Sequence, residues 1–315
     1  MYDDDCRRYK DNILNTDILL LDEISMLSAK LFLQIEHLCR YVRKCDMPYG
    51  GMQVIAAGDF NQLKPVPNKD YNDPGHLVIS HPDIKRLFPH HFVLKDVHRQ
   101  SQVDLIQAVN ELGRGEISKE SADLLRRLKR SLPPGPEPVR LFAHHYDVEK
   151  CNSDHLMDMA GDDHIFRSTD TGNPDELSKM TAPGELHLKI GAPVILTANL
   201  SDSLVNGLRG VVHKIQQDFI TVLFQDGKII KIHRYTFSVF NQLMKRNVAT
   251  RKQFPLKLAF ALTVHKSQGL SLDRVEVDCS EMNVPGQIGV AIGRATNKKG
   301  LRVINFHPRL VTRQP

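Results

Sequence analysis

The chain has 315 residues, of which 41% are hydrophobic and 25% are charged, and it carries a formal net charge of +5 at pH 7. This composition is typical of a folded globular protein with room for two domains, and it excludes a disordered or low-complexity chain. No apolar run approaches the roughly 18 residues that a membrane-spanning helix needs, and the first residues lack the apolar stretch of a signal peptide. The sequence therefore predicts a soluble protein whose mildly basic balance permits, but does not require, a nucleic-acid partner.

Cysteine and histidine spacing speaks against disulfides and zinc. The five cysteines are scattered, and no two of them have C-x-x-C spacing, which indicates reduced thiols in a reducing compartment. The doublets His90-His91 and His144-His145 have no cysteines at zinc-binding spacing, so we expect ordinary surface or core histidines.

The first third of the chain alternates strand and helix patterns. Ile18–Leu21 and Gln53–Ala57 are short apolar strands, and apolar residues recur at helical spacing across Ser28–Lys44 between them. Strand, helix and strand in this order predict a parallel sheet covered by helices.

The middle of the chain changes character. Residues 102–130 have a helical pattern, and four prolines make residues 131–138 a loop. A strand at Val139–Ala143 precedes a helix that we expect to run to about Met159.

From Leu186 to about Val239 the pattern is that of β-strands without helices. Ile220–Phe224 and Ile229–Ile232 flank Asp226-Gly227, which is a strong signal for a tight hairpin. We expect a small β-barrel inserted into an α/β domain. The α/β pattern resumes after Pro255, with strands at Leu262–Val264, Val275–Val277 and Leu301–Phe306 and a helix from about Pro285 to Ala295.

Two acidic motifs follow the first two strands. Asp22-Glu23 ends the strand of LLLDEISML, as expected where acids are delivered to a metal ion and a water molecule, although a helix N-terminus also favours negative charge. Gly58-Asp59-Phe60-Asn61-Gln62-Leu63 follows the second strand, and the alternative there is an Asp-containing turn that caps its own loop. Parallel strands would bring both motifs to one sheet edge, where ligands of α/β proteins bind.

Three further motifs are rich in hydrogen-bond donors. They are His98-Arg99-Gln100, His265-Lys266-Ser267-Gln268-Gly269 and Gly293-Arg294-Ala295. Arginine forks and amide, hydroxyl and ammonium donors suit phosphate groups. For Arg99 the alternative is an ordinary surface arginine, and for Arg294 it is pairing with a carboxylate within the fold. The donors of the HKSQG motif suit a phosphate of either nucleic acid or a nucleotide.

The order of these motifs is more specific than any one of them. LLLDEISM, GGMQVIAAGDFNQLKPV, VHRQ, LKIGAPVIL, LVNGLRGVV, FPLKLAFALTVHKSQGLSLDRVEVD, GQIGVAIGRA and GLRVINF follow one another from residue 19 to residue 306. In this order they resemble the superfamily 1 helicases, and more narrowly the Pif1 family of DNA helicases. The resemblance runs from about residue 13 to about residue 311.

The resemblance implies two RecA-like domains of the α/β class, the first one truncated, and an inserted SH3-like β-barrel called 2B. The first domain would span residues 1–97. The second would span residues 98–185 and 256–315, and the 2B insertion would occupy residues 186–255. ATP would bind between the two RecA-like domains while single-stranded or forked DNA crosses them, driving 5′-to-3′ movement. Family members act in DNA repair, recombination and telomere maintenance.

The resemblance also implies roles for individual residues. Asp22 would hold Mg²⁺ through water, Glu23 would be the catalytic carboxylate, and Gln62 would sense the γ-phosphate. The residues implied to contact ATP are Asp22, Gln62, Arg99, Gly269 and Arg294, with Arg294 in the arginine-finger position. Those implied to contact DNA are His265, Lys266, Ser267 and Asn206.

Two departures from the family pattern stand out. Gly293 replaces the serine that usually precedes the motif VI arginine. The sequence also contains no G-x-x-x-x-G-K-[ST] phosphate loop, because its one Gly-Lys pair, Gly227-Lys228, is followed by Ile229. We therefore expect the C-terminal portion of such a helicase, which alone hydrolyses ATP weakly or not at all.

Three alternatives remain open at this stage. In the first, the chain is part of a longer helicase. In the second, it is a nucleic-acid-binding protein that derives from such a helicase and has lost catalysis. In the third, it is a helicase whose phosphate loop comes from a separate chain. An intracellular setting is expected, in the nucleus or the mitochondrion, and the sequence does not choose between them.

Overall fold

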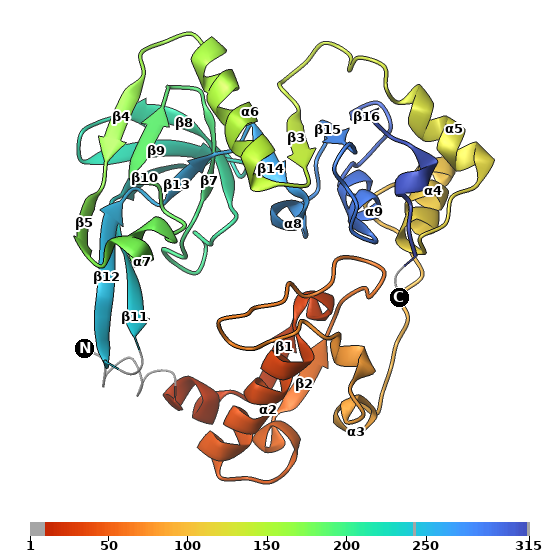
Figure 1. The fold of residues 1–315 in the computed structure, drawn as a ribbon, viewed down its shortest axis with the longest axis vertical. Coiled ribbons are helices and arrows are strands. Elements are labelled where there is room, and N and C mark those ends of the chain that lie inside the picture. The colour runs from red at the N-terminus through yellow and green to blue at the C-terminus, as the bar shows by residue number, and fades with distance from the viewer. Residues whose placement is uncertain (1–9, 242–243, 314–315) are drawn as a thin grey trace. The chain divides into compact units, whose positions relative to one another are not determined.

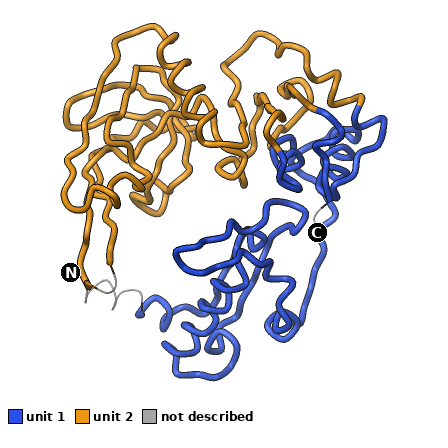
Figure 2. The backbone as a smooth tube through the Cα atoms, viewed as in Figure 1, with its two compact units in different colours: residues 1–122, 283–293, 307–315 blue, residues 123–282, 294–306 orange. Residues whose placement is uncertain are grey.

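The computed structural model of the protein describes residues 10–241 and 244–313. The chain forms two compact units (Figure 2). Unit 1 comprises residues 1–122, 283–293 and 307–315, and unit 2 comprises residues 123–282 and 294–306. These units group residues by packing, and the predicted domain boundaries stay a prediction.

Unit 1 contains the predicted strand–helix–strand pattern. Strands β1 (Ile18–Leu21) and β2 (Gln53–Ala56) pair in parallel, with Leu21 opposite Ala56. Helix α2 (Ala29–Arg43) lies between them in sequence, and the hydroxyl oxygen of Ser28 caps it by accepting a hydrogen bond from the backbone of Leu31. The prediction of a parallel βαβ pattern is confirmed here (Figure 1).

The core of unit 1 lies on one face of this sheet. Phe32, Tyr49 and Phe88 pack ring against ring, with centroid separations between 5.8 and 6.4 Å. The opposite face is apolar and open, because Ile18 and Leu20 keep 50% and 69% of their surface exposed. Exposed branched side chains on a strand mark a surface that another element could cover.

The predicted helical stretch at residues 102–130 is divided into two helices. Helix α4 (Val103–Gly113) and helix α5 (Lys119–Arg127) are separated by a turn in which Gly115 adopts a φ of +70°. The carboxylate of Glu111 accepts hydrogen bonds of 2.9 Å from both the backbone nitrogen and the hydroxyl of Ser118. This side chain holds the turn, which periodicity alone does not reveal.

Helix α9 (Gln287–Ile292) packs against α4 within unit 1. A β-carbon placed on Gly289 would lie 3.1 Å from the backbone nitrogen of Gly113, so the two helices approach closely at this glycine. The remaining short elements of unit 1 are α3 (Ile84–Leu87) and the 3₁₀ turns η1 (Ile24–Met26), η2 (Pro48–Gly51), η3 (Val78–Ser80) and η4 (Pro308–Leu310).

Unit 2 contains a four-stranded parallel sheet in the order β14-β3-β15-β16. Its strands are β3 (Val139–Phe142), β14 (Ala261–Thr263), β15 (Val275–Asp278) and β16 (Leu301–Ile304). Helix α6 (His145–Asp158) packs on β14 and β3, where the Asn152 side chain accepts a 2.9 Å hydrogen bond from the backbone of Ala261. The strands predicted in these places are confirmed.

The predicted β insertion is also present in unit 2. Its main sheet has the order β10-β9-β8-β7-β13, and all its pairs are antiparallel. The strands are β7 (Pro193–Leu196), β8 (Arg209–Ile215), β9 (Phe219–Phe224), β10 (Ile229–His233) and β13 (Leu256–Leu258). The predicted hairpin at Asp226-Gly227 joins β9 to β10, with Gly227 at a φ of +79°.

This sheet is open rather than a closed barrel. Among the described residues no pairing joins β10 to β13. The chain after β10 instead forms a separate sheet of β11 (Tyr235–Asn241), β12 (Arg246–Gln253) and β5 (Thr169–Gly172). Strands β4 (His164–Arg167) and β6 (Glu185–Leu188) form another pair, and the short helix α7 (Pro174–Ser178) lies between β5 and β6 in sequence.

One apolar core connects these strands in unit 2. It combines Val194 and Leu196 of β7 with Phe166 of β4 and with Phe254. The rings of Phe166 and Phe254 meet edge to face, with their centroids 5.0 Å apart. No helix among the described residues is long and apolar enough to cross a membrane.

Candidate active site and nucleic-acid interface

The turn after β1 carries the first acidic motif. Glu23 adopts a left-handed conformation with a φ of +50°, and its backbone nitrogen donates a 2.9 Å hydrogen bond to the Asp22 carboxylate. Such a conformation is uncommon for a residue other than glycine, and strained backbone of this kind clusters at functional sites. The second carboxylate oxygen of Asp22 makes no hydrogen bond or ion pair with the described residues, and the residue is exposed.

The turn after β2 carries the second motif, and Asp59 organises it. Its carboxylate accepts hydrogen bonds from the backbone of Asn61 at 2.9 Å and from the Gln62 amide at 3.3 Å. The alternative of an Asp-containing turn that caps its own loop is therefore present, and the same carboxylate also orients Gln62.

These two turns meet at the carboxyl edge of the β1–β2 pair. The backbone nitrogen of Ile24 donates a 2.9 Å hydrogen bond to the carbonyl of Ala57. A β-carbon placed on Gly58 would lie 2.9 Å from that same nitrogen, so the close approach depends on glycine. Unit 1 thus brings Asp22, Glu23, Asp59 and Gln62 onto one sheet edge, as the sequence predicted for parallel strands.

The HRQ motif contacts the first residue of the GRA motif. The Gln100 amide lies 3.5 Å from the carbonyl oxygen of Gly293, and only 6% of the Gln100 surface is exposed. Arg99 is exposed beside it. The sequence analysis singled out Arg99 within this motif, whereas the contact to Gly293 comes from the buried amide of Gln100.

Arg294 follows directly and belongs to unit 2. It is 3% exposed, and its carbonyl accepts a 2.8 Å hydrogen bond from the backbone of Leu272. Burying a guanidinium carries a desolvation penalty in free energy, which hydrogen bonds or ion pairs have to offset.

The donor-rich VHKSQG segment forms a short turn after β14. Helix α8 (Val264–Ser267) is capped by the hydroxyl of Thr263, which accepts from the backbone of Lys266 at 3.3 Å. The Ser267 hydroxyl is fully buried and donates to the carbonyl of Val264 at 2.7 Å. His265 is partly exposed and Lys266 is exposed, so these two side chains are the ones that α8 offers to solvent.

The two exposed side chains of α8 differ in charge. Burial lowers the pKa of His265, and the nearby His145 lowers it further, so the imidazole is neutral at pH 7 and Lys266 carries the charge. Gly269, which ends the segment, is exposed at a φ of +81°. Asn206 is exposed in the β insertion, where its backbone donates to the Asn199 side chain at 2.7 Å.

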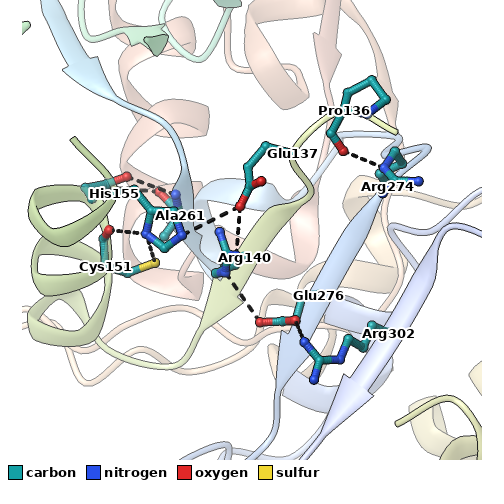
Figure 3. Close-up of polar contacts among 10 residues, drawn as sticks. Pro136, Glu137, Arg140, Cys151, His155, Ala261, Arg274, Glu276 and Arg302 are labelled. Atoms are coloured by element: carbon teal, nitrogen blue, oxygen red, sulfur yellow. Dashed lines mark hydrogen bonds and ion pairs between the residues drawn. The ribbon is translucent and has the colours of Figure 1, made fainter. Parts of the chain in front are cut away.

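A charged ladder on the parallel sheet of unit 2 was not predicted from sequence. Arg140, Glu276 and Arg302 occupy paired positions on β3, β15 and β16 (Figure 3). The Glu276 carboxylate lies 3.4 Å from Arg140 and 2.5 Å from Arg302, and Arg140 also reaches Glu137 at 2.8 Å. In the sequence these three charged residues are far apart. They can be recognised as neighbours only when the register of the three strands is known.

The cysteine and histidine beside this ladder do not form a nucleophilic pair. His155 Nδ1 lies 2.7 Å from the carbonyl oxygen of Cys151 and 3.5 Å from its sulfur, and burial raises the pKa of the Cys151 thiol (Figure 3). A ring nitrogen that faces a carbonyl acts as a donor, so it does not deprotonate the thiol. Among the described residues there is also no group of three or more His, Cys, Asp or Glu that could hold a metal ion.

Comparison with known proteins supplies the context for this arrangement. A family model described as PIF1-like helicase matches residues 5–123, and one described as the 2B domain of DNA helicase Pif1 matches residues 178–215. The chain is 37% identical to the human ATP-dependent DNA helicase PIF1 over 317 residues, which cover 96% of this chain and 48% of the relative. It is 30% identical to the ATP-dependent DNA helicase Pif1 of Bdellovibrio bacteriovorus, covering 98% of this chain and 71% of the relative.

Solved structures agree with these sequence matches. The Pif1 helicase from Candida albicans superposes with a TM-score of 0.87 at 30% identity, covering 98% of this chain and 77% of that one. The Bacteroides Pif1 helicase in complex with ADP-AlF3 and ssDNA gives a TM-score of 0.85 at 30% identity, with coverage of 98% and 75%. The chain spans about half the length of the eukaryotic relatives that it matches in sequence. On these matches the chain belongs to the PIF1-like helicase family, with its RecA-like α/β folds and 2B insertion.

Proposed function

We propose that this chain supplies the hydrolytic acids and the DNA-contacting surface of an ATP-dependent, 5′-to-3′ DNA helicase of the Pif1 type. The observation that carries the proposal is the junction of the two acidic turns at one sheet edge, through the Ile24–Ala57 hydrogen bond. Nucleotide binding at this edge is what parallel α/β sheets of this kind provide.

The acidic turns divide the chemistry between them. Glu23 positions the attacking water and accepts its proton, and Gln62, held by Asp59, reaches the terminal phosphate without adding charge. Mg²⁺ would be held by Asp22 through its water shell and would neutralise charge on the phosphates. The exposed second oxygen of the Asp22 carboxylate fits that task, since a hard cation takes oxygen ligands and keeps several waters.

Two arginines are assigned to the phosphates of the nucleotide. Arg99 and Arg294 would stabilise the charge that grows on the transferred phosphoryl group, as arginine fingers do. Gln100 fixes the carbonyl of Gly293, the residue before Arg294. Gly269 would lie near the phosphates at the end of the VHKSQG segment.

DNA contact is assigned to unit 2. Lys266 offers an ammonium group and His265 a neutral imidazole to the phosphate backbone, with Asn206 as a further contact from the insertion. Ser267 supports this surface by tying the turn of α8 together. A Bacteroides Pif1 structure named for its complex with ssDNA is among the similar structures, which supports a single strand as the partner.

The domain assignment follows from the same proposal. Residues 1–97 would belong to the first RecA-like domain, and residues 98–185 with 256–315 to the second. The 2B insertion would occupy residues 186–255, and the 2B family match at residues 178–215 supports its position.

The open apolar face of unit 1 fits a segment that carries a phosphate loop. The 315-residue sequence has no such loop, while Leu20 on β1 is 69% exposed. The extended stretch Phe92-Val93-Leu94 is 80% to 93% exposed as well. We propose that a strand and helix bearing the loop cover this surface and hold the β- and γ-phosphates.

The experiment that tests the proposed function is a chimera. Residues 10–313 of this chain would replace the matched segment of human PIF1, and ATP hydrolysis would be measured with and without single-stranded DNA. DNA-stimulated turnover supports the proposal. A chimera that folds and binds DNA but does not hydrolyse ATP supports the alternative, a nucleic-acid-binding protein that has lost catalysis.

A further inference from the structure

Strand β10 is an open edge of the β insertion. It pairs with β9 on one side, and among the described residues no strand pairs with it on the other side. At the turn of this hairpin, the backbone nitrogen of Phe224 donates a 2.9 Å hydrogen bond to the carbonyl of Lys228. Hydrogen-bonded and non-bonded residue pairs alternate along an antiparallel ladder, so Ile229, Lys231 and His233 belong to non-bonded pairs. Their backbone N–H and C=O groups therefore point away from β9, toward the open edge.

The side chains of the same three residues lie on the outer face of the sheet. Ile229, Lys231 and His233 alternate with core-facing residues, and all three are exposed. Ile229 continues an aliphatic row across the sheet, because it pairs with Leu223, which pairs in turn with Val211. These three aliphatic residues are 52%, 38% and 40% exposed. An aliphatic row that reaches the edge strand is suited to contact with a further strand.

Lys231 is held in place on this face by an aromatic ring. Its Nζ lies 4.8 Å from the centroid of the Phe219 ring. The same ring packs against the imidazole of His233, with the two centroids 5.9 Å apart. The face of an aromatic ring attracts a cation, so the ammonium group stays close to the sheet beside the open edge.

The charged residues of the next row are cationic. Lys231 and Lys214 both pair with Thr221 of β9, which places them on one face of the sheet. The carboxylate of Asp226 is engaged by Lys228 at 2.8 Å. Among the described residues neither Lys231 nor Lys214 forms an ion pair. The outer face thus combines aliphatic side chains with positive charge, next to a free strand edge.

We propose that β10 binds an extended acidic segment of a partner protein, which adds to the β insertion as a further antiparallel strand. The N–H and C=O groups of a strand edge match another peptide backbone, whereas the phosphates of a nucleic acid offer only acceptors. Single-stranded nucleic acid also binds by stacking its bases on aromatic rings, but the exposed row of Ile229, Leu223 and Val211 is aliphatic. The face therefore favours a peptide.

Lys231 determines which strand the edge accepts. A second copy of β10, paired antiparallel about Lys231, would place lysine opposite lysine, and like charges directly across a ladder are destabilising. Lysine on an edge strand opposes such self-association. A carboxylate opposite Lys231 forms a favourable cross-strand pair instead. The matching segment carries acidic residues opposite Lys231 and His233 and an apolar residue opposite Ile229.

The probe is a fluorescein-labelled peptide that contains Glu-Val-Glu-Val-Ile, and its binding to the full 315-residue chain is followed by fluorescence anisotropy. In antiparallel register its glutamates lie opposite His233 and Lys231, and its isoleucine lies opposite Ile229. Two methylated forms test the backbone contact. N-methylation of both glutamates removes N–H groups that face β10, so it should abolish binding. N-methylation of both valines, whose N–H groups point away from β10, is the matched control and should retain binding.

A charge exchange tests the side-chain contact. We expect Lys231→Glu to weaken binding of the peptide by roughly tenfold, because an attractive cross-strand pair becomes a repulsive one. A second peptide, which contains Glu-Val-Lys-Val-Ile, should bind Lys231→Glu more tightly than it binds the wild type. Lys150→Glu, at an exposed position of α6, makes the same change of net charge and should leave the binding of both peptides unchanged.

The results separate this inference from the proposed function. No binding of the first peptide, or equal binding of its two methylated forms, overturns the added strand and leaves the helicase chemistry untouched. Equal effects of Lys231→Glu and Lys150→Glu overturn the role of Lys231. Displacement of the peptide by oligothymidylate, with weaker oligothymidylate binding by Lys231→Glu, overturns the protein partner in favour of nucleic acid. Circular dichroism melting checks both variants, and the methylated peptides decide on the wild type if Lys231→Glu does not fold.

Discussion

Ile24 and Ala57 are joined by a 2.9 Å hydrogen bond from the backbone nitrogen of one to the carbonyl of the other. This bond brings the turn of Asp22-Glu23 against the turn of Asp59-Gln62. The two acidic motifs are therefore held together by the backbone. A substitution that separates the two turns should change the positions of the side chains in both.

Gly58 is the residue that permits this contact. A β-carbon there would lie 2.9 Å from both the backbone nitrogen and the side chain of Ile24. We expect Gly58→Ala to lower the free energy of unfolding by about 1–3 kcal/mol, the usual cost of overpacking, as measured by urea denaturation. Gly184→Ala is the control, because a β-carbon there meets its nearest atom at 3.8 Å. Equal stability of the two variants would contradict the close approach.

Stability at acidic pH should depend on Glu111. Burial acts to raise the pKa of this carboxyl, but its hydrogen bonds from Ser118 and Gln107 outweigh burial and lower the pKa to about 2. The lowered pKa contributes stability above the unfolded value, near 4.3, and that stability is lost as pH falls toward 2. We expect Glu111→Gln to remove roughly 2–3 kcal/mol of the pH-dependent stability between pH 5 and pH 2.

Urea denaturation of wild type and variant across that range makes the measurement. Glu120→Gln, at an exposed position of α5, is the control and should keep the wild-type pH profile. A Glu111→Gln profile that parallels the wild type would show that the carboxylate is not held as described.

Lys266 and His265 should differ in how they bind DNA. At pH 7 the imidazole is neutral, because burial and His145 lower its pKa, whereas Lys266 is charged. We expect Lys266→Gln to reduce the salt slope of oligothymidylate binding by roughly 0.7, and His265→Gln to weaken binding without changing the slope. Equal slopes for both variants would contradict this division.

Parts of this fold could be predicted from sequence because local signals and packing agreed. The helix after Ser28 was predicted from apolar spacing, and the hairpin at Asp226-Gly227 from its turn residues. The face that α2 buries nevertheless contains Phe32 and Cys39, whereas Leu31 and Leu38 of the predicted apolar stripe are 46% and 48% exposed. The break after Gly113 was not predicted. It is fixed by hydrogen bonds between Glu111 and Ser118, two polar residues whose contact leaves no periodic pattern in the sequence. Closure of the insertion was overestimated, since strand periodicity does not specify which strands pair at the edges.

The candidate site divides in the same way. The placement of Asp22, Glu23 and Gln62 at one sheet edge could be predicted because strand ends place them, and the structure brings their two turns together, while their roles stay a prediction. The contacts of Gln100 and Gly58 could not be predicted, because they involve the carbonyl of Gly293 and the backbone nitrogen of Ile24, which are distant in sequence. Such contacts join residues far apart in the sequence, so no regular spacing of residues predicts them.

The open apolar face gives a prediction that differs between contexts. Leu20 is 69% exposed, so Leu20→Gln should change the stability of the chain alone by no more than about 0.5 kcal/mol. In the chimera with human PIF1 the same change should cost roughly 1–3 kcal/mol, because the covered amide would lack partners. Met157→Gln, at a residue 74% exposed on α6, is the control and should be neutral in both proteins. Equal effects of Leu20→Gln in both contexts would contradict the proposed covering segment.

The most direct test of the catalytic assignment is single-stranded-DNA-stimulated ATP hydrolysis by the chimera with and without Glu23→Gln. The account predicts stimulated turnover for the unchanged chimera and a loss of about 10²- to 10⁴-fold in Glu23→Gln, the range for removal of a general base, with nucleotide binding retained. Turnover that survives Glu23→Gln undiminished would contradict it.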